Sequence, residues 1–423
     1  MAVVGTSMRA IVGAGVLIAF ALAAAGSARG QAKPPPPLAL DGPVSTAPWT
    51  RYAGWPKDDY SKYNTLANLT ASPAPAKEPR KLAQPIAGDA RKGMEVAFDR
   101  RRGGSCLACH AMGQRGANLP GNVGPDLSEI GNAGREDEWL FNYVYDPRVY
   151  NPESVMPPWG AHGVFSDAEI TDIVAFLKTL KTPIKYADPL DDPEKRPVPV
   201  EDRDNLDAMV NPAVWRMEEG EALFRKAGAG GRACVACHAD PARDLKGWAA
   251  RMPYFEPRVG KVLGVEEFIA RHAAATTGDR PLMQSDVNLA LSLYLRNISY
   301  GIEIKVDLGR PGNREAYERG EKLSQSKIGR LNLSCIDCHT PERGGLKWIR
   351  GQWLGEARGQ VPHFPNWRTS RQEIWDIRKR FEWCNVAIQA SELPPDAPVY
   401  GDLELYLTAK NNGLKVAVPG IRH

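Results

Sequence analysis

The stretch Cys106-Leu-Ala-Cys109-His110 decides the fold, because its frame, Cys-x-x-Cys-His, occurs twice more, at residues 234–238 and 335–339. The three frames use six of the seven cysteines in a chain of 423 residues. In c-type cytochromes the two thiols of such a frame attach the porphyrin, and the adjacent histidine binds the iron. The sequence therefore predicts a redox protein with three covalently bound haem c groups.

This interpretation assigns a role to nine residues. The cofactor-binding thiols are those of Cys106, Cys109, Cys234, Cys237, Cys335 and Cys338, and the proximal iron ligands are His110, His238 and His339. Zinc is less favoured, because tetrahedral sites normally combine two cysteine pairs, and zinc gives no reason for a histidine directly after each pair. A thioredoxin-like dithiol is also less favoured, because three copies without a βαβ pattern are not typical of it.

Residues 1–31 have the pattern of a secretory signal peptide. A positively charged start ending at Arg9 precedes the apolar run Ala10–Ala25, and small residues at 26–28 offer a cleavage site. A membrane anchor is the alternative, but the run is rich in alanine and glycine and only weakly hydrophobic. Export also fits haem attachment, which belongs outside the reducing cytosol. We therefore expect a periplasmic protein that does not span a membrane after cleavage.

Composition and proline content indicate how the mature chain is divided. Its length suggests two to four domains, and the formal charge of +4 is too small to indicate a nucleic-acid partner. Residues 32–85 form a proline-rich N-terminal extension, which should be largely extended. Its aromatic residues are too many for a free tail, so we expect part of it to pack on a neighbouring domain. Residues 183–199 are predicted to be an interdomain linker.

The same lead-in precedes each frame, as in repeated domains. A glycine with an apolar residue three positions later stands 13, 14 and 15 positions before the first cysteine, at Gly93, Gly220 and Gly320. We expect a short helix to bring the chain to each haem loop. The predicted fold class is therefore mainly α, with three cytochrome c-like haem domains in tandem at residues 86–182, 200–305 and 306–423.

Two capping boxes predict where later helices begin. Ser166 and Glu169 precede apolar residues at helical spacing, which closes the first domain as in a small class I cytochrome c. Ser370 and Glu373 precede a second such series, which contains Cys384. We therefore expect Cys384 on the apolar face of a helix in the third domain.

The distal iron ligands decide what chemistry each haem supports. Met156 lies on a loop stiffened by the prolines that follow it, and it is the expected distal ligand of the first haem, although Met112 is also available. For the second haem, Met252, His272 and Met283 are candidates. His272 is favoured, because the chain has seven histidines and the frames already use three.

Cys384 is the one cysteine outside the three frames. It can be a small buried hydrophobic residue, but an unpaired thiol in an exported protein is unusual because it is open to oxidation. Arg380 lies one turn earlier on nearly the same side, where it can stabilise a thiolate or an anion. We therefore expect Cys384 to be a sulfur ligand of the third iron and the site of sulfur chemistry.

These residues resemble the SoxXA cytochromes of the bacterial sulfur-oxidising pathway, with SoxX and SoxA fused in one chain. Residues 86–182 are similar to the single-haem SoxX subunit, through the first frame, Gly121–Leu127 and Met156–Gly160. Residues 205–408 are similar to the two-haem SoxA subunit, through the second and third frames, Phe364–Arg368 and, most specifically, Arg380-Phe-Glu-Trp-Cys384.

The resemblance implies an activity. A SoxXA cytochrome joins thiosulfate oxidatively to a cysteine of the carrier SoxYZ, as an L-cysteine S-thiosulfotransferase, and passes two electrons to a small cytochrome c. By position, Cys384 would be the catalytic cysteine and distal thiolate ligand, Arg380 the active-site arginine, and Met156 the distal methionine of the SoxX-like domain.

One segment departs from the family pattern. Where two-haem SoxA members usually place a second cysteine ligand, this chain has Val265-Glu-Glu-Phe-Ile-Ala-Arg-His272. His/His ligation of the second haem would follow.

Thiosulfate is a dianion and needs fixed positive charge in its pocket. Arg380 is the favoured residue, and Arg350, Arg368, Arg371 and Arg378 are further candidates. Two other functions stay open: a thiosulfate dehydrogenase that forms tetrathionate without a carrier, and a non-catalytic multihaem electron-transfer cytochrome.

Overall fold

A computed structural model describes residues 34–49, 59–82, 86–102, 105–113, 119–198, 207 and 209–422. The predicted signal peptide lies outside these ranges, as does part of the predicted proline-rich extension. The chain divides into two units, Met1–Pro36 and Pro37–His423, and every described helix and strand belongs to the second unit.

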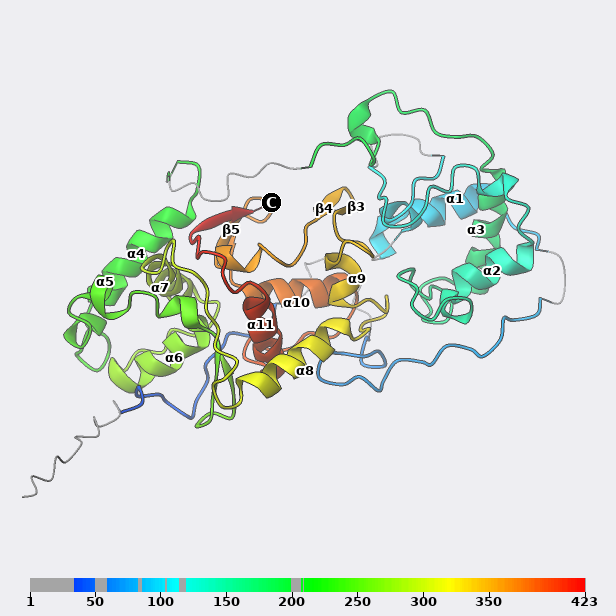
Figure 1. The fold of residues 1–423 in the computed structure, drawn as a ribbon. Helices are drawn as coiled ribbons and strands as arrows, with labels where there is room; N and C mark the ends of the chain where they lie inside the picture. The colour runs from blue at the N-terminus through cyan, green and yellow to red at the C-terminus, as the bar shows by residue number, and fades with distance from the viewer. Residues whose placement is uncertain are drawn as a thin grey trace, which may run out of the picture. The chain divides into compact units, whose positions relative to one another are not determined.

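The described residues form a mainly helical fold, as predicted from the sequence (Figure 1). Its α-helices are α1 (Ala90–Phe98), α2 (Asp137–Tyr145), α3 (Asp167–Thr179), α4 (Ala213–Arg225), α5 (Pro241–Asp244), α6 (Val265–Thr276), α7 (Asp286–Asn297), α8 (Asn313–Gln325), α9 (Cys335–His339), α10 (Ile377–Ala387) and α11 (Pro398–Lys410).

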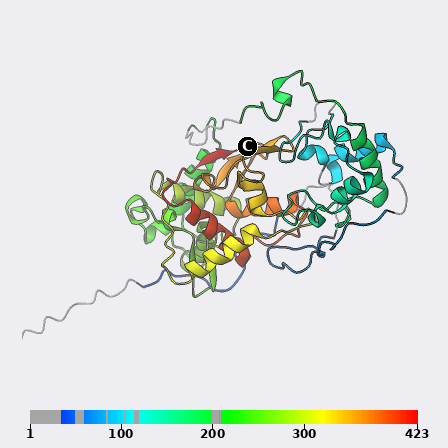
Figure 2. The same cartoon turned by 45° about the vertical axis from the view of Figure 1, so that its right-hand side comes forward.

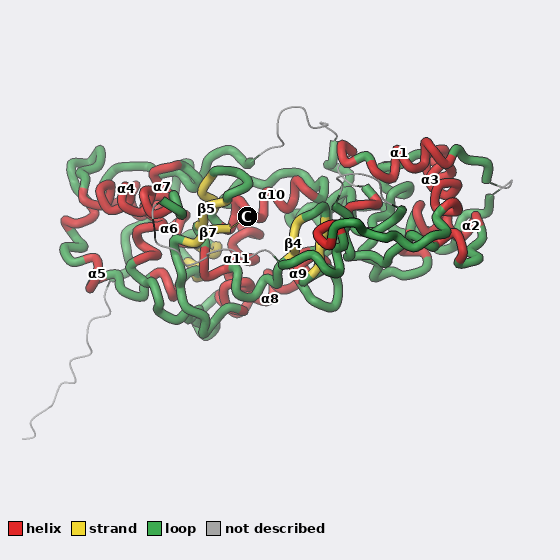
Figure 3. The backbone as a smooth tube through the Cα atoms, turned by 90° about the horizontal axis from the view of Figure 1, so that it is seen from above, coloured by secondary structure: helices red, strands yellow, loops and turns green. Residues whose placement is uncertain are grey.

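The strands are short, as Figure 3 shows in yellow, and they form three small sheets. β1 (Tyr254–Glu256) pairs with β2 (Lys261–Leu263), and β3 (Lys347–Ile349) pairs with β4 (Gln352–Leu354), both antiparallel. β5 (Asn366–Arg368) lies between β6 (Glu373–Trp375) and β7 (Gly420–Arg422), antiparallel to β6 and parallel to β7.

Three helix pairs repeat along the chain, α1 with α3, α4 with α7 and α8 with α11, and they lie side by side in both ribbon views (Figures 1 and 2). In each pair a glycine of the first helix touches the backbone of the second. A Cβ atom at the glycine would overlap a carbonyl oxygen, as follows: Gly93 with Asp172, Gly220 with Ala290, and Gly320 with Asp402. Only glycine allows so close an approach. The predicted short helix before each frame is therefore confirmed.

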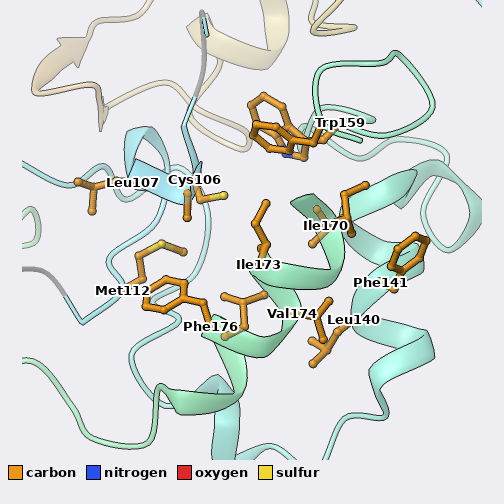
Figure 4. Packing of buried hydrophobic residues seen from close by; sticks show 14 of the residues in the cluster. Cys106, Leu107, Met112, Leu140, Phe141, Trp159, Ile170, Ile173, Val174 and Phe176 are labelled. Carbon is orange, nitrogen blue, oxygen red and sulfur yellow. The ribbon is translucent and has the colours of Figure 1, made fainter. Parts of the chain in front are cut away.

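The helix predicted to close the first domain is also confirmed. α3 begins with the capping box of Ser166 and Glu169, in which each side chain accepts a hydrogen bond from the other residue's backbone N–H. Ile170 and Ile173 are fully buried on its inner face. Figure 4 shows the side chains of α3 packed in one cluster with those of the first frame, including Cys106.

The capping box predicted at Ser370 and Glu373 is wrong. Glu373–Trp375 forms β6 and pairs with β5. The residue before it, Gln372, has a φ of 55°, so the chain turns there into a strand and not into a helix. α10 begins only after the strand ends, and Asp376 caps it by accepting a hydrogen bond from the Lys379 N–H at 2.7 Å.

The segments predicted as the second and third domains share one hydrophobic core. Its buried residues come from both sides of the predicted boundary at 305/306: Ala213, Ala250, Val262, Leu293 and Ile304, and Val306, Ala316, Leu405, Val416 and Val418. Burial of apolar surface from both segments in one cluster makes them stabilise each other.

The described part of the N-terminal extension packs on the helical fold, as expected from its aromatic residues. Tyr60 and Tyr63 are buried, and the Tyr63 hydroxyl donates a hydrogen bond to the His162 carbonyl at 2.6 Å. The linker is also held in place, because the Arg196 guanidinium lies over the Trp348 ring, 4.7 Å from its centroid.

Within the described ranges, every helix is too short or too polar to span a lipid bilayer.

The glycine contacts predict that alanine at position 320 changes the stability in the opposite direction from alanine in an ordinary helix. In an ordinary helix, Gly→Ala is stabilising by about 1 kcal/mol. Gly320→Ala should instead lower the free energy of unfolding by about 1–2 kcal/mol, because its Cβ would overlap the Asp402 carbonyl. Urea denaturation measures this, with Glu318→Ala on the exposed face of α8 as the control. Stabilisation by Gly320→Ala would contradict the packing.

The burial of His162 predicts that the free energy of unfolding depends on pH. Burial lowers the pKa of His162 to about 4, although its Nδ1 contacts the Arg330 carbonyl at 2.8 Å. The unfolded chain therefore binds a proton that the folded chain excludes, and stability falls as the pH drops from about 6.5 to about 4, by roughly 3 kcal/mol. The difference between wild type and His162→Gln in urea denaturation, followed from pH 7 to pH 4, isolates this loss. Equal slopes in the two proteins would contradict it.

Candidate functional site

Each Cys-x-x-Cys-His frame forms one tight helical turn. The first and second turns are 3₁₀-helices, Cys106–Ala108 and Cys234–Ala236, and the third is the short helix α9. In the first two, the histidine N–H donates to the carbonyl of the first cysteine, at 3.0 Å in one and 3.1 Å in the other. The turn therefore brings both thiols and the imidazole into one short loop, as covalent haem attachment requires.

The imidazoles of the first and third frames are held by backbone carbonyls. His110 Nδ1 lies 2.7 Å from the Pro125 oxygen, and His339 Nδ1 lies 2.9 Å from the Gly355 oxygen. Because a carbonyl only accepts, each Nδ1 carries the proton and each Nε2 keeps its lone pair. A metal-binding histidine commonly donates its other N–H in this way. Both residues therefore fit the role of proximal iron ligand.

Most of the frame thiols lie in apolar surroundings. Burial raises the pKa of Cys106 to about 12 and that of Cys109 to about 11. Burial, with the nearby Cys384 as the next cause, raises the pKa values of Cys335 and Cys338 to about 12. A reactive dithiol depends on a lowered thiol pKa. These sites therefore suit an apolar cofactor better than dithiol chemistry.

In the second frame the structure brings two histidines together. The ring centroids of His238 and His272 are 6.3 Å apart, with the planes inclined by 55°. A separation of this size leaves room for one metal ion between the two rings, because first-row metals bind imidazole nitrogen at about 2 Å. The other two candidate ligands, Met252 and Met283, are buried, and Met283 pairs through its backbone with Ser45.

Met156 lies in a bend after the 3₁₀-helix Pro147–Val149. Its N–H donates to the Ser154 hydroxyl at 3.1 Å, and its side chain packs against the core that contains Cys106. Met112 is fully buried in the same core. The structure therefore places both methionines at the core that contains Cys106.

Cys384 on α10 lies next to the third frame. It is half-buried, and it is close enough to Cys335 and Cys338 to raise their pKa values. Arg380, one turn earlier, is near His339: burial and then this cation lower the pKa of the imidazole. The Arg380 guanidinium lies over the Trp383 ring, 4.5 Å from its centroid. A thiol, a cation and an imidazole thus meet at one frame.

The other arginines predicted as anion ligands differ in their surroundings. Arg378 is not available, because it is 2 % exposed and its guanidinium donates to Glu404 at 2.8 Å and to Glu267 at 3.1 Å. Arg371 also lies over the Trp383 ring, at 5.6 Å. Arg368 lies over Trp375, at 5.7 Å. The guanidinium groups of Arg371 and Arg380 therefore both lie over the indole of Trp383.

Two loops, one from the first frame and one that follows the third, join directly. The Asn122 N–H donates to the Trp348 carbonyl at 3.1 Å, and the Trp348 N–H donates to the Asn122 side chain at 2.8 Å. The Arg350 N–H donates to the Ala108 carbonyl, inside the first frame, at 2.9 Å. The hairpin of β3 and β4 therefore connects the first and third frames, which sequence spacing did not predict.

Asp337, inside the third frame, is a further residue that the sequence analysis did not identify. It forms a capping box with Ser334 and pairs with Lys327 at 2.7 Å and Arg343 at 2.5 Å. A signal for it exists in the sequence, because Ser-x-x-Asp before a helix is a capping box. Asp337 thus holds the turn that presents both thiols of the frame.

Two regions of the chain match known families. Residues 219–304 match the family described as SoxA/TsdA, cytochrome c domain. Residues 90–177 match the family described as cytochrome C oxidase, cbb3-type, subunit III. Each region contains one Cys-x-x-Cys-His frame. Cytochrome c domains with covalently bound haem c are therefore confirmed at these two places.

The chain is also similar to curated proteins named L-cysteine S-thiosulfotransferase subunit SoxA. It is 32 % identical to the one from Chlorobaculum thiosulfatiphilum over 209 residues, which cover 49 % of this chain and 70 % of that protein. It is 31 % identical to the one from Chlorobaculum tepidum over the same length and shares. A crystal structure of SoxXA from P. pantotrophus aligns with 51 % of this chain and 80 % of that chain, at 25 % identity and a TM-score of 0.47.

The contacts of Asp337 predict that the third frame depends on it. Asp337→Ala removes both ion pairs and the hydrogen bond from the Ser334 N–H, while Ser334 keeps its own half of the capping box. The substitution should therefore lower the free energy of unfolding by about 3 kcal/mol. Denaturation in urea gives the stability, and intact mass gives the number of attached haem groups. Glu342→Ala, an exposed acid on the same loop, is the matched control and should change neither. A full effect in the control, or none in Asp337→Ala, would contradict the assignment.

Proposed function

The chain belongs to the SoxA family, and from this premise we propose that it joins thiosulfate to a cysteine of a SoxYZ-type carrier protein as an L-cysteine S-thiosulfotransferase. Family members carry that enzyme name. The observation that carries the proposal is the position of Cys384: its thiol lies beside Cys335 and Cys338, one turn after Arg380.

The proposed reaction forms one S–S bond between the carrier thiol and thiosulfate. The carrier thiol loses one proton, the two sulfur atoms together lose two electrons, and the product is a thiosulfate group attached to the carrier cysteine. Haem c, when bound, accepts one electron at a time, so two redox centres or two visits to one centre are needed. The proposed electron acceptor outside the chain is a small cytochrome c.

Arg380 would bind the dianion next to Cys384. A guanidinium can hold an oxyanion through two parallel hydrogen bonds, and the indole of Trp383 limits where this guanidinium lies. Arg371, on the same indole, would add a second positive charge. The thiosulfate sulfur to be oxidised would then lie within reach of the Cys384 sulfur.

We propose a third haem c on Cys335, Cys338 and His339, with Cys384 as distal ligand. Three features support it. The α8–α11 pair repeats the glycine contact of the α1–α3 and α4–α7 pairs. The imidazole of His339 has the same carbonyl partner arrangement as His110. The frame thiols are half-buried, and burial raises their pKa values. The chain would then carry three haem domains at residues 86–182, 200–305 and 306–423.

Met156 is proposed as the distal ligand of the first haem and His272 as that of the second. The separation of the His238 and His272 rings supports the second assignment. Methionine ligation raises the haem potential and thiolate ligation lowers it, so electrons would pass from the third site to the first. The hydrogen bonds between the loop at Asn122 and the hairpin at Trp348 support this route.

We place the protein in the periplasm. The pattern of residues 1–31 is that of a secretory signal peptide. Haem attachment to cysteine pairs also requires thiols that are not exposed to the reducing cytosol.

Cys384→Met tests the proposal, because it keeps a sulfur ligand but removes the thiol. Transfer of thiosulfate to the carrier, measured by the intact mass of the carrier, should fall by about a hundredfold or more. The low-spin thiolate signal in low-temperature electron paramagnetic resonance should disappear. If that signal survives the substitution, Cys384 is not the ligand.

Two controls separate the alternatives. Arg380→Gln should raise KM for thiosulfate and leave the thiolate signal in place, whereas Arg314→Gln, an exposed charge change on α8, should alter neither. Assays without the carrier identify a thiosulfate dehydrogenase, which would form tetrathionate at full rate. A protein that exchanges electrons with cytochromes but turns over thiosulfate in neither assay is an electron-transfer cytochrome.

A further inference from the structure

Residues 37–46, here called the N-terminal strap, run along the domain that contains the second frame, although they come much earlier in the sequence. The Ala39 N–H donates to the Arg271 carbonyl at 3.0 Å, and the Arg271 guanidinium donates to the Ala39 carbonyl at 3.2 Å. Further along, the Met283 N–H donates to the Val44 carbonyl at 2.8 Å. The strap is therefore attached at two points, α6 and the segment before α7.

The strap also contacts a candidate iron ligand. His272 Nδ1 lies 2.8 Å from the Pro37 carbonyl oxygen. His110 and His339 take their carbonyl partners from their own domains, 15 and 16 residues further along the chain. His272 takes its partner from 235 residues earlier. A backbone carbonyl is therefore the Nδ1 partner of this imidazole too, but here the carbonyl belongs to a remote part of the chain.

The His272 ring has an aromatic neighbour on its own helix and a hydrogen-bond partner on the strap. On the helix side the ring stacks on Phe268, with centroids 5.3 Å apart and planes inclined by 22°. The strap residue Leu38 packs against the core cluster that contains Phe268. Stacking restricts the ring plane, and the carbonyl determines which nitrogen carries the proton.

We infer that the N-terminal strap is a positioning element for His272: the Pro37 carbonyl fixes the tautomer and the orientation of this imidazole beside His238. The inference rests on the proposed haem at the second frame. It names a role for the strap in that site, which no resemblance to the family implied.

Two physical consequences follow. With Nδ1 protonated and hydrogen bonded, Nε2 is the nitrogen left for the iron, and its basicity is raised. The imidazole also needs no reorientation to bind, so it should dissociate rarely. Release of the strap should therefore weaken the distal bond and open the sixth coordination position of one haem.

Carbon monoxide is the probe, because it binds ferrous haem only where a coordination position opens. The test protein is the full haem-loaded chain. Ala39→Pro removes the N–H that holds the strap to α6. Its matched control is Ala47→Pro, at an exposed position whose N–H donates no hydrogen bond within the described residues. His272→Gly, with and without added imidazole, gives the rate for an open second haem.

Ala39→Pro should bind carbon monoxide at one haem about tenfold faster than wild type or more, while Ala47→Pro should bind at the wild-type rate. Redox titration should show a higher potential for that same haem, because the ligand nitrogen becomes less basic. Leu38→Ser, which weakens the apolar contact and adds no proline, should act in the same direction. If Ala39→Pro does not fold, Leu38→Ser is the variant that tests the positioning role of the strap.

Two different outcomes overturn different statements. If Ala39→Pro and Leu38→Ser behave as wild type while His272→Gly binds rapidly and added imidazole reverses it, the positioning role of the strap is wrong and His272 remains a ligand. If His272→Gly also behaves as wild type, the assignment of His272 as a ligand is wrong, and the inference is wrong with it.

Discussion

The structure depends on three places where two helices touch backbone to backbone at a glycine. Gly93, Gly220 and Gly320 each bring a lead-in helix against the helix that closes its pair. A side chain there would separate the helices and move the frame that follows. Because the frame begins 13–15 residues after the glycine, the contact sets the position of the thiols and of the imidazole. One local constraint, used three times, thus determines where the three Cys-x-x-Cys-His frames lie.

Hydrogen bonds between segments far apart in the sequence hold the first and third frames near each other. The hairpin of β3 and β4 hydrogen bonds to the loop at Asn122 and to the first frame at Ala108. Backbone hydrogen bonds of this kind leave little freedom of sliding, because a shift of one residue would leave donors unsatisfied. The first and third frames are therefore held in direct contact through their own loops. Among the residues that the structure describes, the second frame takes no part in that junction.

How much the sequence predicted depends on whether the determining contact is local. The frames, the lead-in helices and the capping box of α3 were predicted, because each is specified by residues within one or two turns. The start of α10 was not, because strand pairing with β5 takes Glu373–Trp375 away from helical geometry. Arg378 was one of the further candidates for anion binding, because its burial against Glu267 and Glu404 depends on partners more than 20 residues away, which the local sequence does not show.

The same buried arginine explains how the site at α10 and the site at α6 are kept in fixed relation. Glu267 on α6 is fully buried and pairs with Arg271, Lys261 and Arg378. α6 carries His272 five residues after Glu267, and α10 carries Cys384 six residues after Arg378. Removing one partner of a buried ion pair leaves an unsatisfied charge and costs several kcal/mol, so neither helix can turn without breaking this cluster. The orientation of the Cys384 helix is therefore determined from outside its own segment, which gives a physical reason why the fold around the third frame depends on the segment that contains the second frame.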